Sequence, residues 1–375
     1  MRILEVLSTP LPPTEGIGNY VIGLSTQLIE LGHEVTIVTR KTRGTSSSDS
    51  VSGANVVRLG YLPAFPFHVN IHGRFVKEWI RSIRKKPDVV HLHSPLVPAL
   101  PGPWMSIATF HTPLRADTRY LELSDPLSLP TRLFSPFAQR LERQLLRSAS
   151  AVTAVSGHVL DEVRGYGVPL RRTHILPNAV DPHMYSPTTD PSDDMTLLYV
   201  GRLTARKGLP TLLRAVADIR NSGTEVRLQI VGQGTQKAYI VREASRLHLD
   251  RDAVRFEGFV SKADLLGHYR RASIVVLPSS YEGLPTALLE AMSCGKAVVT
   301  TDIPGVRDAA RHGENAWLVK PESVTELTQG ICTLLRDPDL RRRLGKNARS
   351  TVLRAFTWPV VTREFLSLVA PIPRG

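Results

Sequence analysis

Two glutamates, Glu282 and Glu290, are separated by seven residues that begin with Gly-Leu-Pro. The segment follows an apolar run at 274–277, which is typical of a buried strand, and its proline suits the first turn of a helix. Backbone N–H groups at the start of a helix bind anions, so Gly283 and Leu284 are expected to face a phosphate. Carboxylates beside a phosphate would repel it, so we expect them to bind hydroxyl groups of a sugar and a ribose. The alternative is that Glu282 caps the helix and Glu290 is a solvated helix residue.

A second charged group follows the expected strand 196–200, in the sequence Gly-Arg-Leu-Thr-Ala-Arg-Lys-Gly. Arg202 and Lys207 flank a turn at the carboxyl end of this strand, where ligands of parallel sheets bind. Two fixed cations would hold a diphosphate and stabilise it further as negative charge grows on the leaving group. Nothing in the sequence fixes the direction of Arg206. For Arg202 or Lys207 taken alone, a surface salt bridge is the alternative.

Glycines and histidines follow the strands expected in the first half of the chain. Gly16 and Gly18 come after the strand 2–7 and would let backbone approach a phosphate or a sugar closely. The pair lacks the third glycine of a dinucleotide-binding loop, and ordinary turn glycines are the alternative. His93 and His111 stand at the ends of expected strands and could bond a sugar hydroxyl, although a strand-end histidine is more often structural.

The sequence predicts no metal site and no cofactor. His91 and His93 alternate along one strand and could form a metal pair, but no third ligand stands at a suitable spacing nearby. An Asp-Pro-Asp sequence at 337–339 opens a C-terminal helix and is interpreted as a helix cap.

Composition narrows the class of protein. The chain has 375 residues, of which 42% are apolar and 22% charged, and this predicts a globular protein of two domains. Two cysteines cannot form a disulfide framework, and the acid in the short first apolar run argues against a signal peptide. No apolar run is long enough to span a membrane, so no spanning helix is expected, and the two cysteines fit a reducing, cytoplasmic location. The net charge of +13 fits phosphorylated substrates or an anionic membrane surface, and missing nucleic-acid motifs argue against nucleic acid.

Short β-branched strands alternate with helical stretches, which predicts parallel βαβ units and an α/β fold. Strands are expected at 2–7, 34–39, 56–59, 89–93, 106–110, 151–155, 196–200, 226–231, 254–256, 274–277 and 297–300. Asp-Pro and Ser-Pro pairs near 180–194 predict a linker between two Rossmann-like, doubly wound domains that face a cleft, one at 1–180 and one at 181–357. The stretch 42–53 is expected to be a mobile surface loop, and a helix near 358–368 closes the chain.

Taken in order along nearly the whole chain, these motifs resemble the retaining glycosyltransferases of family 4, which have the two-domain fold called GT-B. The resemblance rests on Gly-Ile-Gly at 16–18, Gly-His-Glu-Val at 32–35, His111, Val155-Ser156, Pro-Asn-Ala-Val-Asp at 177–181, Gly-Arg-Leu at 201–203, Lys207-Gly208, Val-Gly-Gln-Gly at 231–234, Glu-Gly-Phe-Val at 257–260, the two glutamates and Phe-Thr-Trp at 356–358. Two positions depart from the family pattern: Glu15 stands where glycine is frequent, and Gln233 where aspartate is usual.

The resemblance implies a role for each site residue. Arg202 and Lys207 would bind the diphosphate of a nucleotide-sugar donor and replace a divalent metal. Glu282 would contact the donor sugar, Glu290 would hold the ribose, and His111 would contact the sugar near the reacting carbon. The loop Gly16–Gly18 would close over the phosphate and the acceptor. The segment Gly258–Val260 would hold the base of the nucleotide through its backbone.

The family also implies how the domains share the work. The N-terminal domain would bind the acceptor and the C-terminal domain the donor, and the closing helix, about 358–375, would pack back on the N-terminal domain. Transfer would take place on one face of the sugar, with the leaving phosphate accepting the proton of the acceptor. A sugar-phosphate synthase with a soluble acceptor is the nearest alternative, and a non-catalytic sugar-nucleotide-binding protein is another. An oxidoreductase would leave Glu282, Glu290, Arg202 and Lys207 unexplained.

The acceptor is not encoded in any motif, and its class, a lipid-linked or cell-envelope glycan or a small molecule, stays open. Basic clusters at 40–43 and 81–86, with an amphipathic stretch at 133–147, suggest a protein peripheral on the inner face of an anionic membrane. In that stretch Leu133, Phe134, Phe137, Leu141, Leu145 and Leu146 are interleaved with Arg140, Arg143 and Arg147. The alternative is an ordinary domain helix with a solvated basic face.

Overall fold

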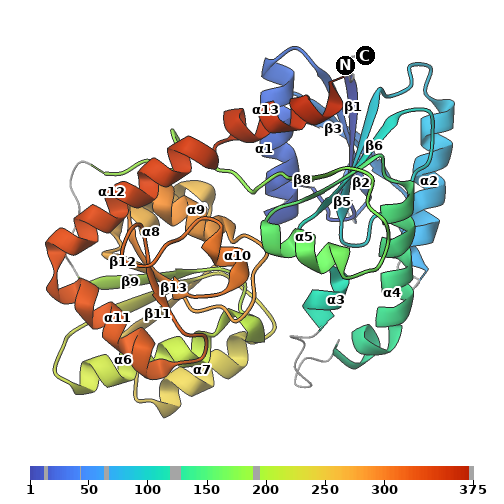
Figure 1. Ribbon diagram of the computed structural model, residues 1–375. Coiled ribbons are helices and arrows are strands. Elements are labelled where there is room, and N and C mark those ends of the chain that lie inside the picture. The colour runs from blue at the N-terminus through green and yellow to red at the C-terminus, as the bar shows by residue number, and fades with distance from the viewer. Residues whose placement is uncertain (12–15, 43, 63–66, 119–127, 189–194, 371–375) are drawn as a thin grey trace. The chain divides into compact units, whose positions relative to one another are not determined.

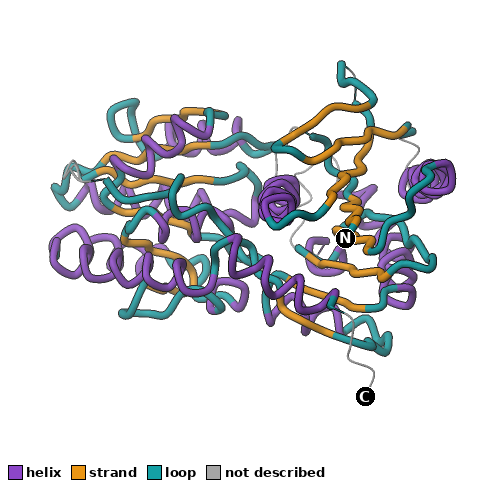
Figure 2. The backbone as a smooth tube through the Cα atoms, turned by 90° about the horizontal axis from the view of Figure 1, so that it is seen from above, coloured by secondary structure: helices purple, strands orange, loops and turns teal. Residues whose placement is uncertain are grey.

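The computed structural model describes residues 1–11, 16–42, 44–62, 67–118, 128–188 and 195–370 (Figure 1). These residues form two compact units. The N-terminal unit contains residues up to 179 together with 358–370, and the C-terminal unit contains residues from 180 to 357. Each unit has one sheet with helices on both faces (Figure 2). The mixed α/β architecture expected from the alternation of strands and helices is confirmed.

The N-terminal unit is built on an eight-stranded sheet among the described residues, in the order β3-β4-β2-β1-β5-β6-β7-β8. All neighbours are parallel except β3 and β4. Its elements are β1 (Arg2–Val6), α1 (Gly16–Glu30), β2 (Glu34–Arg40), β3 (Ser48–Val51), β4 (Ala54–Leu59), α2 (His68–Ser82), β5 (Val89–Ser94), β6 (Met105–Phe110), α3 (Leu114–Asp117), α4 (Ser128–Ser148), β7 (Ala151–Ala154), α5 (Gly157–Arg164), β8 (Thr173–Ile175) and α13 (Trp358–Val369).

The C-terminal unit is built on a parallel sheet of six described strands, in the order β11-β10-β9-β12-β13-β14. Its elements are β9 (Thr196–Val200), the 3-10 turn η2 (Ala205–Lys207), α6 (Leu209–Asn221), β10 (Arg227–Val231), α7 (Lys237–Arg246), β11 (Val254–Gly258), α8 (Lys262–Arg271), β12 (Ile274–Leu277), α9 (Thr286–Ser293), β13 (Ala297–Thr301), α10 (Pro304–Arg307), β14 (Trp317–Val319), α11 (Val324–Arg336) and α12 (Pro338–Ala355).

The last helix returns to the N-terminal unit and packs against α1 (Figure 1). Gly23 on α1 makes the close approach possible, because a Cβ atom built there would lie 2.1 Å from the ring of Trp358. The buried residues Tyr20, Leu24 and Phe365 belong to the same core cluster, so the two helices share one hydrophobic core with the sheet. The chain therefore completes its first unit with its last helix.

The expected strands lie within one or two residues of their observed bounds, because most are apolar runs that are buried on both faces of a sheet, whereas β4 and β11 alternate buried with exposed residues. The expectation of a loop throughout 42–53 is wrong. The residues of β3 pair antiparallel with those of β4. Three of the four residues of β3 are exposed and polar, so the hydrophobic pattern of the sequence did not indicate a strand there. The short strands β8 and β14 were also missed.

Asp337 caps α12 by accepting a hydrogen bond from the backbone N–H of Leu340 at 2.8 Å, so the interpretation of the Asp-Pro-Asp sequence as a cap is confirmed. Within the described ranges, none of the helices combines the length and the hydrophobicity needed to cross a bilayer.

Candidate active site

The loops that follow β9 and β12 lie side by side in the C-terminal unit. The backbone N–H of Ser280 donates to the carbonyl oxygen of Arg206 at 2.8 Å, and the hydroxyl of Thr301 on β13 donates to the carbonyl of Ser279. Behind the second loop, Gly305 in α10 touches its backbone, since a Cβ atom there would lie 2.0 Å from the carbonyl oxygen of Glu282. These contacts fix the two charged loops against each other.

Lys207 and Glu282 form an ion pair across these two loops, between Nζ and Oε1. The same oxygen of Glu282 accepts a hydrogen bond from the hydroxyl of Ser279 at 2.7 Å. Their side chains are only 14% and 10% exposed, so the pair is largely removed from water. The structure therefore brings together the cation expected to bind a diphosphate and the carboxylate expected to bind a sugar hydroxyl.

Gly208 allows Lys207 to take this position. Its φ of +66° lies in the left-handed region, and a Cβ atom there would lie 2.0 Å from the carbonyl oxygen of Pro278. Only glycine combines this backbone conformation with this close contact. The Lys-Gly pair that ends η2 is thus one structural unit.

Charge and burial act in opposite directions on this ion pair. Burial would raise the pKa of Glu282, but the positive charges of Lys207 and Arg206 outweigh it and lower that pKa. Burial lowers the pKa of Lys207, and the Glu282 carboxylate partly restores it. A second anion placed beside Lys207, such as a diphosphate, would favour the charged lysine further.

Glu282 does not cap the helix that follows it. The N-cap of α9 is Pro285, and no side chain supplies a cap hydrogen bond. The N–H groups of Leu288 and Leu289 donate to the carbonyl of Pro285, at 3.2 and 3.4 Å, so the first-turn N–H groups that can meet an anion are those of Thr286 and Ala287. Gly283 and Leu284 are buried in the turn between Glu282 and this helix.

Glu290 lies in α9 and is held by tyrosines from neighbouring segments. The hydroxyl of Tyr269 on α8 donates to Oε2 of Glu290 at 2.8 Å, and Tyr185 is a second hydrogen-bond partner. Burial raises the pKa of Glu290, which these hydrogen bonds partly oppose. The alternative that Glu290 is an ordinary solvated helix residue is therefore wrong. The tyrosine hydroxyls orient its carboxylate, and no sequence motif predicted this contact.

The carboxyl ends of β9, β10 and β11 are joined by backbone hydrogen bonds. Gly232 N–H donates to the carbonyl of Gly258 at 2.7 Å, and Leu203 N–H donates to that of Gln233 at 2.9 Å. Arg202 is exposed at this end of the sheet, and Val260 is half-buried there. The guanidinium of Arg206 lies 6.0 Å from the ring centre of Tyr281, so the direction of Arg206 is constrained after all.

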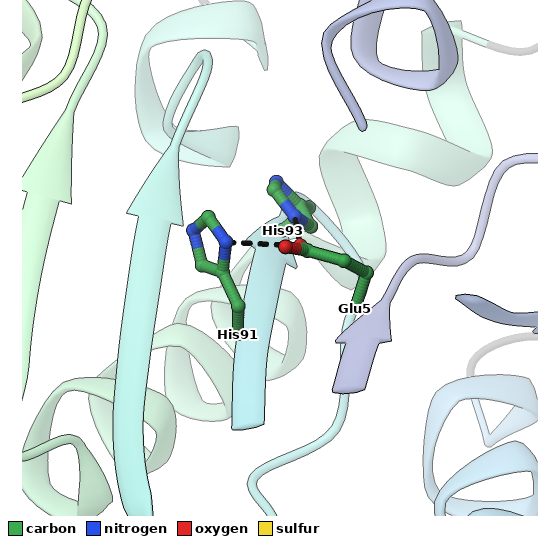
Figure 3. A group of neighbouring side chains, drawn as sticks. All are labelled: Glu5, His91 and His93. Carbon is green, nitrogen blue, oxygen red and sulfur yellow. Dashed lines mark hydrogen bonds and ion pairs between the residues drawn. The ribbon is translucent and has the colours of Figure 1, made fainter. Parts of the chain in front are cut away.

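A second cluster of ionisable side chains lies in the N-terminal unit (Figure 3). The parallel pairing of β1 with β5 sets Glu5 opposite His91, and the Nε2 atom of His93 donates to Oε2 of Glu5 at 2.6 Å. One ligand-type atom from each of Glu5, His91 and His93 lies within 4.8 Å of the others. The expectation that no third ligand lies near the two histidines is therefore wrong. Sheet register brings together residues that are far apart in sequence.

His111 extends this cluster from the end of β6. Its Nε2 atom lies 3.2 Å from Nδ1 of His93, and it is 8% exposed, whereas Glu5, His91 and His93 are at most 1% exposed. Burial lowers the pKa of His93 to about 4 and holds that of His111 well below its ordinary value. Burial alone would raise the pKa of Glu5, yet the two adjacent histidines lower it to about 2. In the sequence, the only sign that Glu5 belongs to this cluster was that it is an acid within a short apolar run.

Gly16 and Gly18 lie in the first turn of α1, and Gly18 is buried. Glu15, one of the two departures from the family pattern, lies outside the described residues. The sequence also gave no sign of Glu142, a buried acid on α4 that accepts hydrogen bonds from Ser94 at 2.9 Å and from the hydroxyl of Tyr166. Glu142 also accepts from the backbone N–H of Leu114, which anchors the segment after His111.

Comparison with known proteins supports this arrangement of motifs. Residues 14–183 match the model of the family described as Glycosyltransferase Family 4, and residues 186–351 match that of Glycosyl transferases group 1. The glycogen synthase of Mycobacterium tuberculosis is 29% identical over 404 aligned positions, which cover 100% of this chain and 96% of the relative.

Solved structures share the fold along the whole chain. Sucrose-phosphate synthase from Thermosynechococcus elongatus superimposes with a TM-score of 0.84 at 23% identity, covering 98% of both chains. HepE from Anabaena, solved in complex with UDP-glucose, superimposes with a TM-score of 0.75 at 18% identity, covering 99% of this chain and 100% of the other. The chain therefore belongs to the group 1 glycosyltransferases of the family 4 type and has the GT-B fold.

Proposed function

We propose that this glycosyltransferase moves a sugar from a nucleoside-diphosphate donor to an acceptor with retention of the anomeric configuration. The observation that carries the proposal is the Lys207–Glu282 ion pair beside the N-terminus of α9. It offers a cation and the N–H groups of Thr286 and Ala287 to a diphosphate, and a carboxylate to a sugar hydroxyl, within one pair of loops. HepE, a structure of the same fold, holds UDP-glucose.

The chemistry we propose needs no divalent metal. The bond between the anomeric carbon and the phosphate oxygen breaks, and the acceptor oxygen forms a new bond on the same face of the sugar. The proton of the acceptor passes to the departing phosphate. Arg202 and Lys207 stabilise the charge that builds on that phosphate, Glu290 holds the ribose, and His111 bonds a hydroxyl of the transferred sugar.

The N-terminal unit is proposed to bind the acceptor and the C-terminal unit the donor. Two acceptor classes are supported by different observations. A sugar phosphate is the acceptor class suggested by the fold shared with a sucrose-phosphate synthase. A lipid-linked or cell-envelope glycan is suggested by the surface of α2 and α4.

The helices α2 and α4 carry the features of a membrane-facing surface. Phe67 is 56% exposed just before α2, and its ring centre lies 5.6 Å from that of Phe137 on α4. Leu133 is 68% exposed, and Arg74 and Lys77 are exposed on α2. Apolar side chains flanked by basic ones favour an anionic lipid surface, and on this basis we propose a protein peripheral on the inner face of the membrane.

Only part of the basic and apolar stretches is available for such a surface. Leu145 and Leu146 are at most 2% exposed and belong to the core, and Arg143 stacks on Tyr166, with 5.9 Å between guanidinium and ring centre. Lys86 donates three hydrogen bonds of 2.8 Å to carbonyls at the end of α2. The C-terminal half of α4 is thus an ordinary packed helix, and the proposal rests on its N-terminal half and on α2.

The test of the main proposal is nucleotide release. Purified protein is incubated with UDP-, GDP- and ADP-sugars, each with a sugar-phosphate, glycan or lipid-linked acceptor, in the presence of EDTA. One donor should give free nucleotide, and NMR of the product should show the anomeric configuration of the donor. Activity that strictly requires a divalent metal would contradict the mechanism, and an inverted product would contradict retention.

A further inference from the structure

A continuous chain of contacts runs through the core of the N-terminal unit and ends at His111. From β7 it passes between the hydroxyls of Thr153 and Thr109, and Thr109 lies 2.6 Å from Nε2 of His91. Nδ1 of His91 and Nε2 of His93 both approach the same oxygen of Glu5, at 2.9 and 2.6 Å. The last contact, 3.2 Å long, joins Nδ1 of His93 to Nε2 of His111.

The positions of the protons along this chain follow from the chemistry of its members. An ionised carboxylate only accepts hydrogen bonds, so Nε2 of His93 carries the proton that points at Glu5. A neutral imidazole has one N–H, which leaves Nδ1 of His93 as an acceptor. The nitrogen facing it, Nε2 of His111, must then be the donor. The proton of His111 is therefore on Nε2, and its Nδ1 presents a lone pair.

The geometry favours hydrogen bonds over a metal centre among these side chains. Ligand atoms bound at about 2.0–2.2 Å to one metal ion lie about 3 Å or more from each other. The 2.6 Å between Nε2 of His93 and Oε2 of Glu5 is a hydrogen-bond distance. Each histidine also has a second partner on its other nitrogen, Thr109 for His91 and His111 for His93.

Aromatic side chains hold the rings of this chain in place. Tyr20 on α1 meets the rings of His93 and His111 edge-on, with centroids 5.7 and 4.9 Å apart, and Phe365 on α13 packs against His91. Glu5, His91 and Thr109 are 0% exposed, and His93 is 1% exposed. Among the described residues Nδ1 of His111 has no hydrogen-bond partner, so the lone pair is available at the carboxyl end of β6.

We propose that Glu5 and His93 are positioning residues that hold His111 in the Nε2-protonated tautomer, so that its Nδ1 accepts a hydrogen bond from a hydroxyl of the bound sugar. The inference rests on the proposed function in one respect, namely that the hydroxyl belongs to a substrate of the transferase. The tautomer itself is a property of the free protein. It also explains why an acid stands in a strand whose other buried residues are apolar: the acid fixes the proton of His93 on the neighbouring strand.

The test is the ¹⁵N spectrum of histidine side chains in protein labelled at the ring nitrogens, without substrate. The chain has 12 histidines, and the signals of His111 are identified by their loss in His111→Asn. At pH 7 the wild type should show a protonated Nε2 and an unprotonated Nδ1 for His111. A protonated Nδ1, or signals averaged between two tautomers, would overturn the proposal.

Two variants of His93 separate positioning from packing. His93→Gln keeps a donor toward Glu5 and an acceptor toward His111, so it should retain the single tautomer and most of the turnover. His93→Leu removes both, so the His111 signals should become averaged and kcat should fall about tenfold, the equivalent of one hydrogen bond. If His93→Leu leaves signals and turnover unchanged, the proposal is wrong.

Thr153→Val is the matched control, because it breaks the same buried chain at its far end and leaves the His93–His111 contact intact. It should keep the His111 tautomer and the turnover even where it lowers stability as much as His93→Leu. If His93→Leu fails to fold, the wild-type and His93→Gln spectra still decide. Metal analysis of the same samples completes the test: one bound metal ion in wild type that is lost in His93→Gln would show ligation and overturn the hydrogen-bonded chain.

The outcome is distinguishable from failure of the proposed function. If no nucleotide sugar gives turnover, the transferase proposal fails while the tautomer measurement stands by itself. If a donor is found but His111 carries its proton on Nδ1, only the positioning role of Glu5 and His93 is lost.

Discussion

Lys207 and Glu282 form an ion pair that joins the loop after β9 to the loop after β12. The two residues are 75 positions apart in the sequence, yet their largely buried side chains are in contact, and Ser279 donates a hydrogen bond to the same carboxylate. The carboxylate of Glu282 fixes the position of the lysine within the protein itself. The pair therefore sets the direction of the Lys207 ammonium group.

The first prediction is that Lys207→Ala and Glu282→Ala each reduce turnover at least about 100-fold, because each removes a charge from the site. Each should also lower the free energy of unfolding by about 2–3 kcal/mol, since the partner is left as an unpaired, mostly buried charge. The double variant should lose less stability than the two single losses combined.

The measurement is a double-mutant cycle by urea denaturation, with nucleotide release as the activity assay. Lys320→Ala is the control, because Lys320 pairs with Glu326 at the surface and its side chain is 80% exposed. That variant should change stability by less than about 0.5 kcal/mol and keep activity. Strictly additive losses for Lys207 and Glu282 would contradict a direct coupling between them.

The second prediction concerns Gly208, whose replacement by alanine should cost more than about 2 kcal/mol and lower donor affinity. The reason is the clash of the new Cβ with the carbonyl of Pro278, added to the strain of a φ of +66°. Gly223→Ala is the matched control in the same unit, since its φ is +87° but nothing lies within 4 Å of a Cβ there. Equal losses in thermal or urea denaturation of both variants would show that backbone strain alone matters.

The third prediction is that Tyr269→Phe weakens binding of the nucleotide about tenfold, because Glu290 loses the hydroxyl that orients it. The same hydrogen bond lowers the pKa of Glu290 against the effect of burial, so its loss raises that pKa further. In calorimetric titrations, affinity should therefore decline at a higher pH in Tyr269→Phe than in wild type as the pH is lowered. Tyr239→Phe, at an exposed position on α7, should behave as wild type.

The fourth prediction is a loss of stability in acid that depends on His93. Its pKa falls from 6.5 to about 4 on folding because the ring is buried, so the unfolded chain binds the proton more tightly than the folded one. The contribution of the neutral, buried His93 ring to the free energy of unfolding is fully present above pH 6.5, and it is lost as the pH falls from 6.5 to about 4. His93→Gln removes the titration, so its unfolding free energy should depend less steeply on pH across that window.

The fifth prediction is binding to vesicles that contain anionic lipid at low salt, measured by co-sedimentation. Replacing Arg74 and Lys77 on α2 by glutamate should abolish it, because both side chains are exposed beside the apolar surface around Phe67. Arg343 and Lys346, exposed at the same spacing on α12, provide a control with an equal change of charge. Binding lost equally in both double variants would indicate a general effect of net charge and would remove the proposed surface.

The order of strands and helices could be predicted from the sequence because it depends on local pattern. Apolar runs mark strands buried on both faces, and glycine, proline and aspartate mark the ends of helices, as Asp337 does for α12. The exposed strand β3 was not predicted from the sequence, because its residues are mostly polar and form a strand only by pairing with β4.

The same local pattern singled out Lys207, Glu282 and Glu290, because each lies in the segment that connects a strand to the next helix or inside that helix. What the sequence could not give is the pairing of side chains across elements. Tyr269 reaches Glu290 from another helix, and Glu5 meets His93 from a strand 88 positions earlier. Such contacts are decided by sheet register and helix packing, which place residues side by side regardless of their spacing in the chain. The sequence by itself determined which residues are the candidates for the chemistry, and the tertiary structure alone decided which of them hold one another in place.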